Sequence, residues 1–179
     1  MLQLENTGLI VIDVQGKLAR IVHESEKLIQ NLEKLIRGCQ ILSLPIICAE
    51  QNPAGLGSTV PELQKLFANQ KPIAKFSFNA LENNLFKEAI IQSKRKRWIV
   101  CGIESHICVY QTVIGLLDAS FEVEIAADCI SSRTEENKIL ALNKLQNKGA
   151  SITSVEMCLY ELVKNSKNEN FKEILNLIK

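Results

Sequence analysis

The sequence is short of the features that mark membrane and nucleic-acid-binding proteins. It contains no uninterrupted apolar run of about 18 residues, so no membrane span is expected. Its 21 Lys and Arg balance 20 Asp and Glu, which leaves a formal net charge of +1. Nucleic-acid-binding domains usually carry a basic excess or a basic stripe, and the basic run Lys94–Arg97 is interpreted as a solvated helix end. We therefore expect neither a membrane nor a nucleic acid as partner.

Signatures of metal, nucleotide and disulfide chemistry are also missing. There are only two His, no Cys-x-x-Cys pair and no glycine-rich phosphate motif, so neither a zinc site nor a nucleotide cofactor is expected. A chain of 179 residues can bury a core without disulfides, and its six cysteines are expected to be reduced. Residues 1–7 carry no basic region of the kind that starts a signal peptide, which predicts a cytoplasmic protein.

Apolar runs alternate with segments of helical periodicity along the whole chain. This alternation is typical of right-handed βαβ units, and it predicts a single α/β domain over residues 1–179 with a parallel sheet covered by helices on both faces. Gly38 is predicted to end a helix, and Ser132-Arg133-Thr134-Glu135 is interpreted as a capping box. The expected strands are 8–14, 45–50, 72–75, 97–103, 121–127 and 150–154, and the expected helices are 28–36, 61–67, 79–93, 105–119, 132–148 and the tail 159–178.

Reactive side chains follow the predicted strands at the edge where doubly wound sheets bind ligands. Asp13 comes after five apolar residues of the first strand, where a buried carboxylate is costly unless it is paired or functional. Lys75 ends the third strand and is its natural counter-charge. The simpler alternatives are that Asp13 caps a neighbouring loop and that Lys75 forms a plain salt bridge.

Cys108 is the candidate nucleophile of the chain. It falls in the first turn of a helix that is expected to begin near Ser105, where backbone N–H groups and the helix dipole favour a thiolate. A nearby Lys would lower the pKa of the thiol further, and the same N–H groups could bind an oxyanion. A structural cysteine is the alternative. His106 is two residues away and does not share a helix face with Cys108, so a Cys-His pair is not expected.

Three segments, in order, resemble the isochorismatase-like cysteine hydrolases, the superfamily that includes nicotinamidases. They are residues 9–15 (LIVIDVQ), 75–77 (KFS) and 100–109 (VCGIESHICV). The resemblance extends to residues 50–63, 127–133 and 149–156, and so covers most of the chain. The loop EQNPAGLG and the segment GIESHIC are most similar to the isochorismatase domain-containing branch.

The resemblance implies a fold and a set of roles. The fold is a three-layer, Rossmann-like domain with a six-stranded parallel sheet of order 3-2-1-4-5-6. Asp13 would be the general acid and base, Lys75 its charge partner and Cys108 the nucleophile. The N–H groups of Glu104 and Cys108 would form the oxyanion hole, next to a cis peptide bond between Ile103 and Glu104.

The implied activity is hydrolysis of a small amide or carbamoyl C–N bond through a thioester on Cys108. Metal-dependent nicotinamidases carry an Asp/His cluster in the loop after the second strand, whereas the loop 51–61 has no His, so no catalytic metal is expected. A homo-oligomer, a dimer or tetramer, is expected from relatives. A non-catalytic or redox-sensing interaction module and an isochorismate-type vinyl-ether hydrolase are the alternatives. The side chains expected to line a pocket for a small-molecule substrate are Gln15, Gln51, Phe76, Ser77 and Tyr110.

Overall fold

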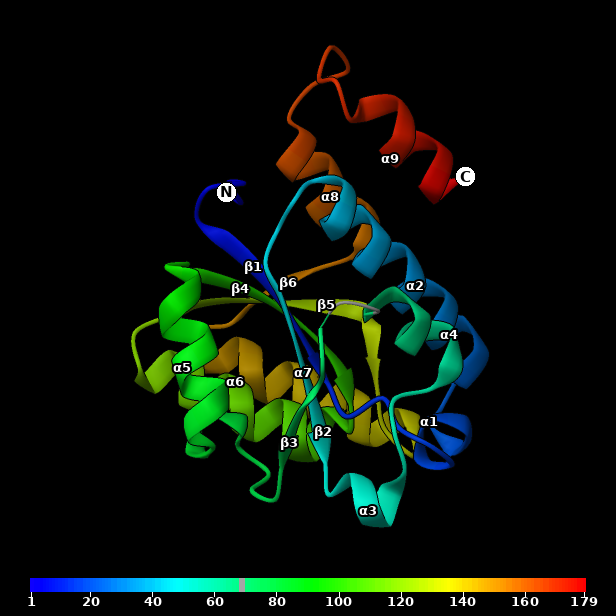
Figure 1. Ribbon diagram of the computed structural model, residues 1–179, viewed down its shortest axis with the longest axis vertical. Coiled ribbons are helices and arrows are strands. Elements are labelled where there is room, and N and C mark those ends of the chain that lie inside the picture. Colours follow the sequence, from blue (N-terminus) through cyan, green and yellow to red (C-terminus); the bar gives the residue numbers. More distant parts are fainter. Residues whose placement is uncertain (68–69) are drawn as a thin grey trace.

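A six-stranded parallel sheet runs through the centre of the computed structural model, which describes residues 1–67 and 70–179 (Figure 1). The strand order is β3-β2-β1-β4-β5-β6, so the predicted α/β fold and its 3-2-1-4-5-6 topology are confirmed. The strands are β1 (Thr7–Ile12), β2 (Ile46–Gln51), β3 (Ile73–Lys75), β4 (Arg97–Ile103), β5 (Glu122–Ser131) and β6 (Ser151–Thr153).

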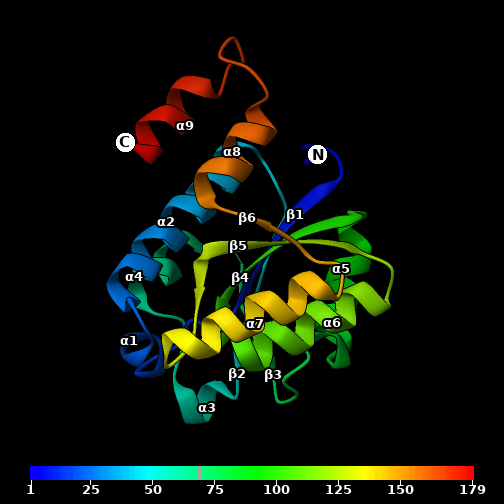
Figure 2. The same ribbon diagram turned by 180° about the vertical axis from the view of Figure 1, so that it is seen from behind.

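Helices cover both faces of this sheet, as the views from the front and from behind show (Figures 1 and 2). One layer contains α2 (Ser25–Ile41) and α8 (Val155–Val163), with α9 (Phe171–Ile178) packed outside them. The opposite layer contains α5 (Asn84–Ser93), α6 (Tyr110–Asp118) and α7 (Glu135–Asn147). The short helices α1 (Leu18–Ile21), α3 (Pro53–Leu56) and α4 (Pro61–Gln64) lie in connections.

The two cores follow from the alternation of side chains along each strand. In β1, Leu9 and Val11 pack toward α2, while Ile10 and Ile12 pack toward α5 and α6. All four are fully buried. A strand covered on both faces has no polar position, and this is why the sequence shows a continuous apolar run instead of an alternating pattern.

Two helix predictions were wrong in detail. Helix α2 continues past Gly38 to Ile41, because Gly38 is a packing residue: a Cβ there would lie 2.6 Å from Leu159 Cδ1. The helix expected over 79–93 is divided into a 3-10 turn, Ala80–Glu82, and α5. Leu85, near the start of α5, is 65% exposed.

Two predictions around β5 also need correction. The N-cap of α7 is Thr134, whose hydroxyl accepts the N–H of Asn137 at 3.4 Å, and not Ser132. Strand β5 extends to Ser131, beyond its predicted end at residue 127, so Asp128 lies inside it. The Asp128 carboxylate accepts the N–H of Val155, the first residue of α8, at 3.1 Å and therefore caps that helix.

A glycine allows β1 and β4 to approach each other beside the switch point. Gly102 has a φ of 119° and sits where the register between β4 and β5 shifts, and a Cβ there would overlap the carbonyl oxygen of Ile12. Gly149 has a similar φ of 101°, but nothing lies within 4 Å of its would-be Cβ.

We expect Gly149→Ala to lower the free energy of unfolding by about 1–2 kcal/mol through backbone strain alone. Gly102→Ala adds a clash between two central strands, and we expect a loss of more than about 3 kcal/mol. Urea unfolding of both variants measures the difference. Equal losses would contradict a close contact between the two strands.

Candidate active site

Three strand ends bring the candidate catalytic residues together. Asp13 directly follows β1, Lys75 is the last residue of β3, and Cys108 lies in a helical turn, Ser105–Val109, after β4. Since β1 and β4 are neighbours at the switch point of the sheet, Asp13 and Cys108 lie at the crevice that this fold provides for ligands. Lys75 reaches the same place from the edge strand: its Nζ donates to Asp13 Oδ2 at 2.8 Å. The side chains of Lys75 and Asp13 are 0% and 3% exposed, so this ion pair is buried.

The second carboxylate oxygen of Asp13 is available for a proton. Oδ1 is buried and, among the described residues, has no hydrogen-bond donor. Burial raises the pKa of Asp13 above its ordinary value, and the charge of Lys75 and its hydrogen bond oppose that rise, with a smaller opposing contribution from Cys108. An ionised carboxylate with a raised pKa and a free oxygen is a suitable general base.

Cys108 does not have the lowered pKa that its place in a helical turn predicts. Burial raises the pKa of Cys108 to about 12, the negative charge of Asp13 adds to the rise, and Lys75 only partly opposes it. The residue is 7% exposed. Desolvation therefore outweighs the helix dipole and the nearby ammonium, and the resting residue is a protonated thiol and not a thiolate.

The backbone before Cys108 has an unusual path. The peptide bond between Ile103 and Glu104 is cis. The carbonyl of Glu104 then accepts the N–H groups of Ile107 and Val109 at 3.1 and 3.2 Å, which closes a wide, π-helical turn around Cys108.

The side chain of Glu104 attaches this turn to the end of β5. Its carboxylate accepts Nε and Nη2 of Arg133 at 3.0 and 3.1 Å and the backbone N–H of Arg133 at 3.2 Å. Burial alone would raise the pKa of Glu104, but Arg133 more than offsets it and the pKa is lowered. His106 Nδ1 lies 2.9 Å from Ser132 Oγ on the same side. The end of β5 thus supports the turn that carries Cys108.

The two glutamines predicted to line the substrate pocket are engaged by the protein itself. Gln15 is 0% exposed, and its amide bonds only to backbone groups of Gln51 and Gly57. Gln51 Oε1 accepts Nζ of Lys75 at 2.7 Å, and its Nε2 donates to the carbonyl of Phe76 at 2.6 Å. The internal hydrogen bonds of Gln15 and Gln51 leave no periodic mark in the sequence. The sequence therefore does not distinguish an internal role from a role in a substrate pocket.

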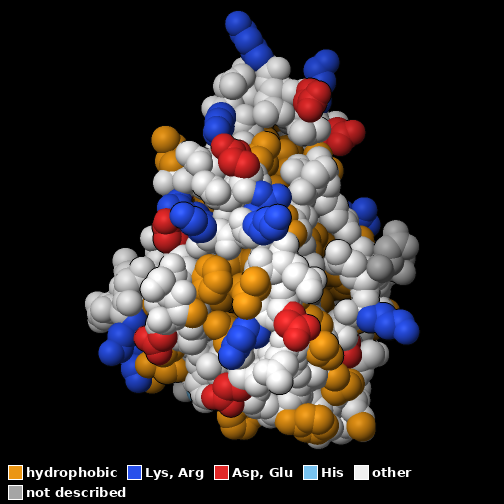
Figure 3. All heavy atoms as spheres, turned by 60° about the vertical axis from the view of Figure 1, so that its left-hand side comes forward, with side chains coloured by type: hydrophobic (Ala, Val, Ile, Leu, Met, Phe, Trp, Pro, Cys, Tyr) orange, Lys and Arg blue, Asp and Glu red, His pale blue; other side chains and the backbone are white. Residues whose placement is uncertain are grey.

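The other three predicted pocket residues make contacts of different kinds, and their place in a substrate pocket stays a prediction. Ser77 Oγ donates to the carbonyl of Asn79, and the carbonyl of Ser77 accepts Nζ of Lys75 at 3.3 Å. Tyr110 lines a cavity, and Lys144 Nζ lies 4.9 Å from its ring centre. Phe76 is 78% exposed and Phe78 is 51% exposed. Figure 3 shows apolar side chains gathered at the middle and lower edge of the face that carries α5. The predicted homo-oligomer would have apolar surface to bury there, and it stays a prediction.

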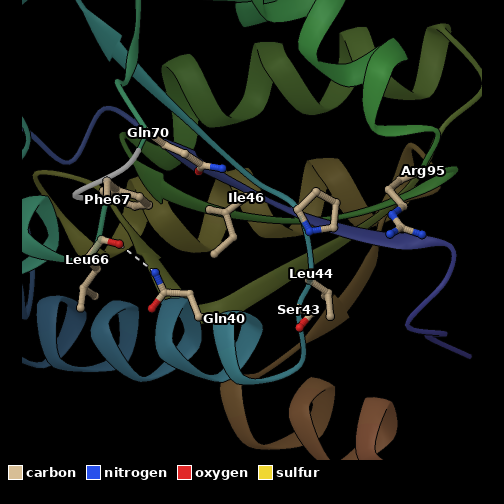
Figure 4. A pocket seen from close by; sticks show the side chains of 9 residues that line it. Gln40, Ser43, Leu44, Ile46, Leu66, Phe67, Gln70 and Arg95 are labelled. Atoms are coloured by element: carbon tan, nitrogen blue, oxygen red, sulfur yellow. Dashed lines mark hydrogen bonds between the residues drawn. The ribbon is translucent and has the colours of Figure 1, made fainter.

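Five cavities formed by residues 1–67 and 70–179 are lined by residues other than Asp13, Lys75 and Cys108. One of about 460 Å³ lies at the opposite end of the sheet, between the end of α2 and the start of β2 (Figure 4).

The described part of the chain contains no group of three or more His, Cys, Asp or Glu that could hold a metal ion. In that same part, no helix is both long and apolar enough to cross a membrane.

Comparison with known proteins agrees with this geometry. The isochorismatase domain model matches residues 7–157. Isochorismatase domain-containing protein 2 of Danio rerio is 34% identical over 177 residues, covering 99% of this chain and 89% of that protein. The secreted isochorismatase effector Isc1 of Phytophthora sojae is 33% identical over 175 residues, covering 96% and 83%. The structure of MAR1 ribonuclease from Caenorhabditis elegans has a TM-score of 0.93 at 33% identity, covering 99% and 91%.

These matches show that the chain belongs to the isochorismatase-like hydrolase family, so the resemblance seen in the sequence is confirmed. One relative is described as secreted, and membership of the family therefore does not fix the compartment. The cytoplasmic location stays a prediction.

We expect iodoacetamide to alkylate Cys108 slowly near neutral pH, compared with an ordinary thiol of pKa about 8.5. Asp13→Asn removes a negative charge that raises the pKa of Cys108, so the reaction should become faster at a given pH. Site-resolved mass spectrometry across a pH series measures both rates, with the exposed Asp118→Asn as control. Fast labelling of the wild-type residue at pH 7 would contradict a protonated resting thiol.

Proposed function

We propose that the protein is a metal-independent cysteine hydrolase that cleaves a small amide or carbamoyl C–N bond. Cys108 is the nucleophile, Asp13 the general acid and base, and Lys75 the charge partner of Asp13. The buried ion pair between Lys75 and Asp13 is the main support, because within the described residues it leaves Asp13 Oδ1 without a donor, and because Asp13 and Cys108 lie close enough to shift each other's pKa. A merely structural ion pair would not need an unpartnered oxygen next to a thiol.

In the first half-reaction, Asp13 Oδ1 takes the proton of the Cys108 thiol while Sγ forms a bond to the carbonyl carbon. The π electrons of the carbonyl move to oxygen, and the N–H groups of Glu104 and Cys108 bind the resulting oxyanion. The tetrahedral intermediate then re-forms the carbonyl and breaks the C–N bond. The departing amine takes the proton from Asp13, which leaves a thioester on Cys108 and an ionised Asp13.

In the second half-reaction, Asp13 takes a proton from water as the water oxygen bonds to the thioester carbon. The new intermediate expels the sulfur of Cys108, which recovers its proton from Asp13. The products are a carboxylic or carbamic acid and an amine or ammonia, and the enzyme returns to a thiol and a carboxylate. Lys75 keeps its charge throughout and stabilises the ionised form of Asp13.

The burial of Cys108 also weighs against the redox-sensing alternative. A redox sensor needs an accessible thiolate, whereas Cys108 is 7% exposed and burial raises its pKa. A vinyl-ether hydrolase would not need a nucleophilic sulfur at this position, so substitution of Cys108 separates it from the proposed amidase.

We expect Cys108→Ala to lower kcat for amide hydrolysis by at least about 10³-fold, because the thioester route needs the sulfur. Wild-type enzyme and variant are compared on a panel of small primary amides and carbamoyl compounds by ammonia release, with Cys39→Ala as a buried-thiol control. Turnover of isochorismate that survives in Cys108→Ala would favour the vinyl-ether hydrolase. If no compound is hydrolysed and the protein binds a partner in a way that peroxide changes, the redox-sensing interaction module would be favoured.

In the pH profile of kcat/KM, we expect the midpoint of the acidic limb at a higher pH than the ordinary pKa of an Asp side chain. Burial raises the pKa of Asp13, and Asp13 must be ionised to act as the base. Lys75 lowers that pKa, so Lys75→Met should move the limb to still higher pH, in addition to lowering the rate. The exposed Lys87→Met serves as control. A limb that shifts to lower pH in Lys75→Met would contradict the assigned sign.

A further inference from the structure

Gln51 lies between the two charged residues of the candidate site because of the strand order. Strand β2 separates β3 from β1, and Gln51, the last residue of β2, pairs in register with Lys75. Any lysine that reaches from β3 to Asp13 must therefore pass the end of β2. The side chain found there is an amide, which can accept a hydrogen bond from an ammonium without adding a charge.

The orientation of this amide is set by its other end. Gln51 Nε2 donates to the carbonyl of Phe76 at 2.6 Å, so Oε1 is the atom that faces Lys75 and accepts its Nζ at 2.7 Å. With Asp13 Oδ2 at 2.8 Å and the carbonyl of Ser77 at 3.3 Å, the ammonium has three acceptors, and it has three N–H donors to satisfy. Gln51 therefore helps to set where the charge of Lys75 lies.

Gln15 holds Gln51 from the opposite side. Its Oε1 accepts the backbone N–H of Gln51 at 2.7 Å, while its Nε2 donates to the carbonyls of Gln51 at 3.1 Å and of Gly57 at 2.6 Å. The side chain of Gln15 thus binds both backbone polar groups of Gln51, as a neighbouring strand would. It is completely buried, and both ends of its amide bond to the backbone.

We propose that Gln51 is a positioning residue that holds the ammonium of Lys75 against Asp13, and that Gln15 is a second positioning residue that acts through Gln51. This assignment replaces the substrate contacts predicted for both glutamines, and its effect on turnover rests on the proposed function. The charge that faces Asp13 is that of Lys75, and the thiols of Cys108 and of Cys48 in β2 are the titratable groups whose pKa the charge of Asp13 raises. Cys108 is in turn faced by Asp13 and Lys75.

The test compares Gln51→Met with Gln40→Met. Gln40 makes the same kind of bond, from its Nε2 to the carbonyl of Leu66 at 2.8 Å, at the far end of the sheet (Figure 4). Methionine keeps the length of the side chain and removes both polar ends. Urea unfolding first establishes that both variants are folded under the assay conditions.

The first readout is the rate of Cys108 alkylation at a fixed pH below its midpoint, which needs no substrate. If Gln51 holds Lys75 in place, Gln51→Met weakens the influence of Lys75, the pKa of Cys108 rises, and the alkylation rate falls by about threefold or more. Gln40→Met leaves the rate unchanged. An unchanged rate in folded Gln51→Met overturns the proposal, whether or not any amide is hydrolysed. This readout therefore separates failure of the positioning role from failure of the proposed function.

The second readout uses an amide that the wild-type enzyme hydrolyses. A positioning role predicts that Gln51→Met lowers kcat by roughly 10- to 100-fold, with a small change in KM and an acidic limb at higher pH. A rise in KM with unchanged kcat and pH profile would instead assign Gln51 to substrate binding and overturn the proposal. Gln15→Met is expected to change kcat and the pH profile in the same direction, because its effect passes through Gln51.

Discussion

The buried ion pair between Lys75 and Asp13 is the interaction on which the rest of the site depends. Removing two charges from water is expensive, and the cost is offset only when the geometry is good and the remaining donors are satisfied. The sheet meets this condition by ending three adjacent strands at one place, so that Asp13, Gln51 and Lys75 follow one another across β1, β2 and β3.

The same low-dielectric environment explains the state of Cys108. A desolvated thiol next to a carboxylate keeps its proton, although it lies in a helical turn and near an ammonium. Asp13, the proton acceptor in the proposed mechanism, is buried with it. In that mechanism the thiol becomes reactive only when a carbonyl carbon is present to accept the sulfur, and its high pKa protects it from unspecific alkylation and oxidation.

Much of the fold could be predicted because the strands are buried on both faces and so appear as apolar runs. The pairing of Asp13 with Lys75 could be predicted because a charge buried at a strand end requires an opposite charge nearby. Features that depend on contacts between residues distant in sequence could not be predicted. Gly38 fits against Leu159, which is remote in sequence. The high pKa of Cys108 arises from tertiary burial, and the internal bonds of Gln51 involve loop carbonyls that no periodicity marks.

The shortness of β3 has a consequence for how the molecule opens. This edge strand has only three residues, and all of them pair with β2. By hydrogen bonding alone it would be among the first elements to fray. Yet detaching β3 would move the ammonium of Lys75 into solvent and leave the carboxylate of Asp13 buried without its counter-charge, which is unfavourable. The ion pair thus resists opening of the sheet at this short edge strand, and local opening there is coupled to the protonation of Asp13.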